Sequence, residues 1–182
     1  MQKKESIPQD KLQQLKPQLY AISSTKFPFQ KVLELFKQQL GMYPGTLLQK
    51  PIVIDYLSVK ENILLAYSIA YPKNKHKEQI LEDAFEEVGI DLDDLSAIPL
   101  IDLSLETVLK IQLITHSLCH TKIILVDNWL SNLPEEDVKE ITLFLKYICQ
   151  QQKCTILIHT SNNTIVQKCD ETIFLDPLLS VS

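Results

Sequence analysis

Two adjacent polar residues, Asp127 and Asn128, have the types and the position that could do chemistry. They follow directly after Ile123-Ile124-Leu125-Val126, an aliphatic run that predicts a short buried strand of a parallel sheet. An acid at the carboxyl end of such a strand points into the crevice where α/β sheets bind ligands. Asp127 is therefore a candidate ligand-binding residue. The Asn128 amide can hydrogen-bond a water molecule but cannot accept its proton at neutral pH.

The helix before this strand is the element that would position Asp127 and Asn128. Ser104 is a suitable N-cap for a mostly apolar helix that ends at the polar break His120-Thr121-Lys122. His116, Cys119 and His120 are spaced so that they could hold a metal ion. No fourth ligand lies nearby, so we favour the alternative that these residues mark the helix end, where His interacts well with the helix dipole.

Both strands and helices are predicted along the rest of the chain, as in an α/β protein. Further strands are predicted at 18–23, 155–159 and 169–175, and helices at 29–40, 60–70, 73–89 and 135–152. Residues 41–46 are interpreted as a turn region, and Gly89 as a helix C-cap. Asn132 and Glu135 resemble a capping box at the start of the last long helix, with Pro134 in its first turn.

Composition limits the possible functions. The 182 residues are one domain's worth of chain, 45% apolar, with a net charge of −5 and no basic run that would favour nucleic acid as a partner. Every basic residue is a lysine, so the chain has no arginine to clamp a phosphate. The first residues lack the apolar core of a signal peptide and the four cysteines form no CxxC pair, so we expect a cytoplasmic protein with free thiols.

Glycine is scarce, with only three in the chain, at positions 41, 45 and 89. A phosphate-binding P-loop needs glycines because its backbone N–H groups must wrap closely around the phosphate oxygens. The predicted strand 18–23, a loop that contains Lys26, and the helix 29–40 have the outline of a P-loop without its glycines. Lys26 could still reach a phosphate, but we favour an ordinary solvated lysine because the backbone cradle carries much of a P-loop's binding.

The stretch from Leu103 to Pro134 resembles the core of an ABC-transporter ATPase. Leu103-Ser104-Leu105-Glu106-Thr107 falls on the family's signature LSGGQ, Asp127-Asn128 on the Walker B Asp-Glu, and Ser131-Asn132-Leu133-Pro134 on the D-loop, without a gap. The resemblance implies that Ser104 and Asp127 lie at nucleotide-binding positions. It also implies that Asn128 replaces the Glu that orients or deprotonates the attacking water.

Two further segments match the same family in order and spacing. Gln49, followed by Leu57-Ser58-Val59-Lys60-Glu61-Asn62-Ile63, resembles the Q-loop and the segment behind it, so Gln49 would sense Mg²⁺ or the attacking water. About 50–103 would then form the helical subdomain that contacts a membrane permease. The family's switch histidine falls on Ser161, whereas His159 is two residues early and is expected to face the other way.

The resemblance covers about 19–176 and implies a P-loop NTPase-like parallel sheet with an ABC-type helical subdomain, in a single domain over 1–182. It leaves the family's N-terminal antiparallel β-subdomain reduced or absent, with 1–18 as a polar lead-in. Since phosphoryl transfer needs several groups acting together, the leading hypothesis is a non-hydrolytic subunit that is a structural or regulatory partner in a membrane transporter complex.

Two alternatives to this hypothesis stay open, and so does the identity of the partners. The chain could be a slow ATPase that binds Mg-ATP through Lys26, Gln49, Ser104 and Asp127, or a soluble regulatory scaffold. Its partners would be a permease subunit, a second cassette or a copy of itself, at the inner face of the cell membrane. The C-terminal pattern resembles that of cassettes that serve lipid traffic, which implies a lipid as the transported substrate.

Overall fold

The computed structural model describes residues 14–23, 27–41, 43–51, 53–54, 56–86, 89–91, 95 and 102–175. Its elements, in chain order, are β1 (Leu19–Ser23), α2 (Phe29–Leu40), β2 (Gly45–Leu47), α3 (Val59–Ala70), α4 (Lys77–Glu86), α6 (Leu105–Leu118), β3 (Ile123–Val126), the 3-10 helix η2 (Asn128–Asn132), α7 (Glu135–Gln152), β4 (Thr155–Thr160), α8 (Asn163–Lys168) and β5 (Glu171–Phe174). Within the described part of the chain, none of the helices has the length and apolar character needed to cross a membrane.

Contacts divide the chain into two compact units, which are described separately below. The sheet unit comprises Met1–Thr46 with Lys122–Ser182, and the helical unit is Leu47–Thr121. The helical unit therefore begins close to the predicted subdomain boundary near residue 50. It continues past 103 to include α6, the helix that carries Ser104.

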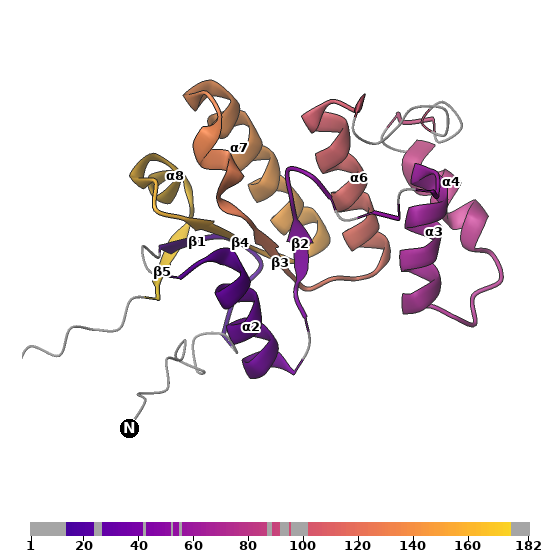
Figure 1. Cartoon of the computed structure of the whole chain (residues 1–182), viewed down its shortest axis with the longest axis horizontal. Helices are drawn as coiled ribbons and strands as arrows, with labels where there is room; N and C mark the ends of the chain where they lie inside the picture. Colours follow the sequence, from indigo (N-terminus) through magenta and orange to yellow (C-terminus); the bar gives the residue numbers. More distant parts are fainter. Residues whose placement is uncertain are drawn as a thin grey trace, which may run out of the picture. The chain divides into compact units, whose positions relative to one another are not determined.

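The sheet has five strands in the order β2-β3-β4-β1-β5 (Figure 1). β4 pairs in parallel with both β3 and β1, with Ile156 opposite Leu19, and β1 pairs in parallel with β5. In the sheet unit, α2 covers one face of the strands, and α7 and α8 cover the other (Figure 1). The predicted α/β architecture, a parallel sheet flanked by helices, is confirmed.

The strands in the middle of the sheet form where the sequence is continuously apolar. All six residues of β4 are buried, and the last three residues of β3 are fully buried, as expected for strands covered on both faces. α2 packs onto the sheet through an apolar stripe that includes Val32 and Phe36, and α7 does so through Val138 and Leu145.

The helical unit has its own apolar core between α3, α4 and α6. Its buried members are Val59, Ile63, Leu81, Phe85, Leu95, Ile111 and Ile114. α3 starts with a capping box, in which the Ser58 hydroxyl accepts the Glu61 N–H and the Glu61 carboxylate accepts the Ser58 N–H.

Two local predictions were wrong. The segment interpreted as a turn at 41–46 contains the beginning of β2, a strand too short to show an alternating pattern. Asn132 does not cap α7, because it is the last residue of η2, and Pro134 occupies the N-cap position without a side-chain hydrogen bond. Gly89 does have the left-handed conformation expected of a C-cap, and its N–H donates to the Glu86 carbonyl.

Candidate functional site

Asp127 lies where the sequence predicted, immediately after β3 at the carboxyl end of the sheet. Its backbone is extended, and its carboxylate accepts the N–H of Asn128 at 2.7 Å, so it caps the 3-10 helix η2. One carboxylate oxygen is thus engaged in holding the turn. A carboxylate has further acceptor capacity, so this contact leaves Asp127 able to bind a hydrated cation.

A chain of polar side chains connects the end of β3 with the end of β4. The Ser131 hydroxyl donates to the Asn128 side-chain oxygen at 2.5 Å and lies 3.2 Å from the Thr160 hydroxyl oxygen. Thr160 accepts the backbone N–H of Asn162 at 3.0 Å. The Asn128 side chain, at the position where the resemblance implies a catalytic Glu, is therefore held by Ser131.

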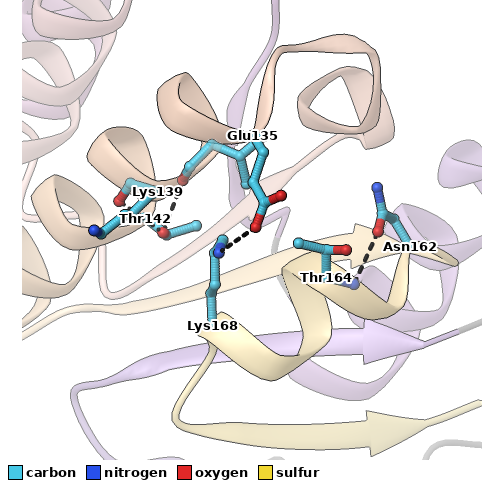
Figure 2. Close-up of polar contacts among 7 residues, drawn as sticks. Glu135, Lys139, Thr142, Asn162, Thr164 and Lys168 are labelled. Carbon is cyan, nitrogen blue, oxygen red and sulfur yellow. Dashed lines mark hydrogen bonds and ion pairs between the residues drawn. The ribbon is translucent and has the colours of Figure 1, made fainter.

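α8 continues this arrangement beyond β4 (Figure 2). The Asn162 side chain caps α8 by accepting the Thr164 N–H at 2.9 Å, and Lys168 of α8 approaches Glu135 at the start of α7 at 3.4 Å. Within α7, the buried Thr142 hydroxyl is satisfied by the carbonyls of its own helix. Through its bonds with Thr160 and Thr164, Asn162 holds the backbone next to Ser161, the exposed residue at the predicted switch position.

His159 is directed away from this polar chain, toward α2. It is only 7% exposed, its ring lies 6.1 Å from the Phe29 ring, and neither ring nitrogen has a well-formed hydrogen bond. Burial lowers the pKa of the His159 imidazole below its ordinary value, and the Phe27 backbone and the Asp127 carboxylate oppose this effect without reversing it. His159 is therefore a neutral core residue at neutral pH.

The lowered pKa of His159 predicts how the stability of the sheet unit depends on pH. The unfolded chain binds a proton on this histidine at a higher pH than the folded chain does, so folding becomes less favourable as the pH falls below about 6.5. We expect His159→Phe to flatten the decrease in unfolding free energy between about pH 7 and pH 5, measured by urea denaturation. The exposed His76→Gln is the matched control, and an unchanged slope in His159→Phe would contradict the assignment.

The start of α2 occupies the place of a P-loop helix but presents different groups. Its N-cap is Pro28, which provides no side-chain hydrogen bond, and its first residue, Phe29, is buried. In the pattern G-x-x-x-x-G-K-[ST], the Lys and the hydroxyl residue begin the helix, whereas here Gln30 and Lys31 follow Phe29. Lys26, the predicted phosphate ligand, lies outside the described residues.

The remaining predicted site residues belong to the helical unit. Gln49 is exposed in the segment after β2. The residue before it, Leu48, is held by Gln112 of α6, whose side-chain amide accepts the Leu48 N–H at 3.0 Å and donates to the Leu48 carbonyl at 2.9 Å. The Ser104 hydroxyl caps α6 by accepting the Thr107 N–H, as predicted.

The two histidines at the end of α6 contact neighbouring side chains of the helical unit. His116 lies near the Thr121 hydroxyl, and His120 has a left-handed backbone and an edge-on contact with Tyr71. The described residues include no group of three or more His, Cys, Asp or Glu side chains placed to hold a metal ion. All four cysteines are free thiols.

Sequence reasoning missed two residues that shape these regions, Thr160 and Gln112. Thr160 could have been found, because it ends the strand before Ser161 and neighbouring parallel strands bring their carboxyl ends together. Gln112 gave no such signal, since a polar residue in an amphipathic helix usually faces solvent.

Comparisons with known proteins agree on one family of folds. No family model matches the chain. The uncharacterized ABC transporter ATP-binding protein YclH of Bacillus subtilis is 27% identical over 136 residues, which are 74% of this chain and 59% of that protein. The chain thus spans less than two thirds of the length of this curated relative.

Two solved structures have the same fold. One is a chain of an ABC transporter in an inward-facing conformation, with a TM-score of 0.65 and 19% identity, covering 87% of this chain and 69% of that one. The other is cbiO1 from Clostridium perfringens, part of the ABC transporter complex cbiONQ, with a TM-score of 0.61 and 16% identity, covering 87% and 73%. The parallel sheet and its helices therefore have the fold of ABC-type, P-loop NTPase-like proteins.

Proposed function

We propose that this chain is an ATP-binding-cassette-like subunit of a membrane transporter complex that does not hydrolyse ATP and has a structural or regulatory role. Support for the transporter setting comes from the relatives, which are ABC transporter ATP-binding proteins or parts of such complexes. The proposed partners are a membrane permease and a second cassette or a second copy of this chain. The proposed location is the inner face of the cell membrane.

The main support for a loss of hydrolysis is the presence of an amide, Asn128, at the position of the catalytic carboxylate. An amide cannot take a proton from an attacking water at neutral pH, and this amide oxygen already accepts one hydrogen bond, from the Ser131 hydroxyl. The glycine-free connection between β1 and α2 supports the same proposal, because Phe29 and Gln30 begin the helix, where a P-loop has its Lys and hydroxyl residue.

Calorimetric titration of the purified protein with Mg-ATP tests the proposal. We expect no measurable heat and no shift in melting temperature at millimolar nucleotide. A nucleotide that bound the folded protein would raise its stability and therefore its melting temperature. Micromolar binding accompanied by phosphate release would show that the proposal of a non-hydrolytic subunit is wrong.

One observation favours a second candidate, a slow ATPase. Asp127 lies directly after β3, where its carboxylate would hold hydrated Mg²⁺. Under this candidate, Asp127→Ala would abolish Mg²⁺-dependent nucleotide affinity. Affinity that is the same in the variant and the wild type would exclude it.

A further inference from the structure

Two cysteines at the end of α7 are brought together by the way in which this helix ends. α7 stops at Gln152, and Lys153 after it has the left-handed backbone conformation, with a φ of 51°. At such a helix end, the side chain that follows the left-handed residue commonly packs against the side chain five positions before it. These two positions are Cys154 and Cys149 in this chain. The turn therefore pairs two thiols that form no CxxC motif.

The two thiols are in direct contact inside the sheet unit. A hydrogen bond joins the Cys149 thiol, as the donor, to the Cys154 sulfur. The two residues are 0% and 2% exposed, respectively. Cysteines whose side chains point apart cannot be bridged without movement of the backbone, whereas these two point toward each other. Both are free thiols in this structure, so the structure shows the reduced form of the pair.

The surroundings make Cys154 the more acidic of the two thiols. The hydrogen bond from Cys149 lowers the pKa of Cys154, burial opposes this effect, and the Lys122 ammonium lowers the pKa further. The same hydrogen bond, together with burial, raises the pKa of Cys149. Burial also raises the pKa of Cys119, and it raises that of Cys169 to about 12. Because the thiolate is the reactive form of cysteine, Cys154 is the cysteine best suited to act as a nucleophile.

We propose that Cys149 and Cys154 are a redox-active pair, which a low-molecular-weight disulfide of the glutathione class oxidises reversibly to an intramolecular disulfide. The Cys154 thiolate attacks one sulfur of the small disulfide, which releases one small thiolate and leaves a mixed disulfide on Cys154. Cys149 gives its proton to the released thiolate, attacks the Cys154 sulfur and displaces the second small thiolate. That thiolate takes up the proton that Cys154 had lost. One small disulfide is thus reduced to two thiols, and the two cysteines are oxidised.

The last turn of α7 is the part that must open for this reaction, because both sulfur atoms are buried. Gln150, Gln151 and Lys153 in and after this turn are exposed. Helix ends fray, and the left-handed conformation of Lys153 is strained for a residue that has a Cβ. The pair therefore lies at a point of the sheet unit where a small local opening admits a small disulfide.

The pair is separate from the candidate site around Asp127. Cys154 immediately precedes β4, where the Thr155 N–H donates to the Lys122 carbonyl at 2.8 Å. β3 and β4 are parallel, so Cys154 lies at the amino end of these strands, whereas Asp127 follows β3 at their carboxyl end. Oxidation of the pair thus does not depend on whether the chain binds a nucleotide.

Mass spectrometry of the purified full chain, incubated in native buffer with an excess of oxidised glutathione, tests the proposal. Remaining free thiols are alkylated, and the chain is then digested with trypsin, which cleaves after Lys153, between the two cysteines, and after Lys168, before Cys169. We expect the peptides 147–153 and 154–168 to remain linked, and dithiothreitol to separate them. No linked pair, a link to either of the other cysteines, or stable glutathione adducts on both members of the pair would overturn the inference.

Serine variants test which thiol attacks first. Cys149→Ser keeps a hydroxyl that can donate to the Cys154 sulfur but cannot close the disulfide, so we expect a glutathione adduct to accumulate on Cys154. In Cys154→Ser, we expect Cys149 to form an adduct about tenfold or more slowly, because its thiolate is less populated. Cys169→Ser is the matched control and should form the same disulfide as the wild type. Equal rates in the first two variants would overturn the order of attack, and the wild-type measurement tests the pair without any substitution.

Discussion

Leu130→Ala is expected to lower the free energy of unfolding of the sheet unit by about 2–5 kcal/mol, the range for a large-to-small change in a core. Leu130 is fully buried in η2, between Asn128 and Ser131. Truncating its side chain leaves a cavity in the core at η2, the segment that carries Asn128 and Ser131. We therefore also expect the contact between Ser131 and Thr160 to loosen.

Urea denaturation followed by the fluorescence of the single tryptophan, Trp129, measures this change, since Trp129 adjoins Leu130. The matched control is Leu143→Ala on α7, where the same side chain is 58% exposed and the expected change is within about 0.5 kcal/mol. Equal effects in the two variants would mean that η2 does not pack against the core as described.

Asn62→Leu is expected to destabilise the helical unit by about 2–4 kcal/mol, because it removes four hydrogen bonds of a partly buried amide. The Leu57 carbonyl and the Ile54 N–H would lose the Asn62 side chain as their hydrogen-bond partner. Hydrogen exchange measures the result, and we expect faster exchange at Ile54 and through the first turn of α3.

Gln79→Leu is the control for this prediction, since Gln79 is an exposed amide of α4 with one side-chain partner, Asp83. Its expected effect is a few tenths of a kcal/mol. If Asn62→Leu is no more destabilising than Gln79→Leu, Asn62 does not hold the segment that leads into α3.

The parts of the fold that the sequence predicted well are those with long, regular hydrophobic patterns. α2, β3 and α7 have the predicted bounds because continuous apolar runs define buried strands and a regular stripe defines each helix. β2 was missed because three residues cannot show a period. The start of α7 was misassigned because Asn132 has the residue type of a cap but belongs to η2.

The sequence predicted where the candidate site lies, but not the hydrogen bonds within it. Asp127 follows a strand that the apolar pattern identifies, so its place at the carboxyl end of the sheet could be inferred. The link from Ser131 to Thr160 joins residues far apart in the sequence, and it depends on which strands are neighbours. The roles of Gln49, Ser104, Asn128 and Ser161 toward a nucleotide stay predictions.

The order of the strands has a consequence for how the protein is synthesised. β1 is made first, yet its neighbours are β4 and β5, with Leu19 opposite Ile156. At about 5–20 residues per second on the ribosome, β1 waits on the order of ten seconds for its neighbours. The helical unit is continuous in sequence and can fold in that interval. The apolar strand Leu19–Ser23 therefore needs protection from aggregation until β4 and β5 have been made.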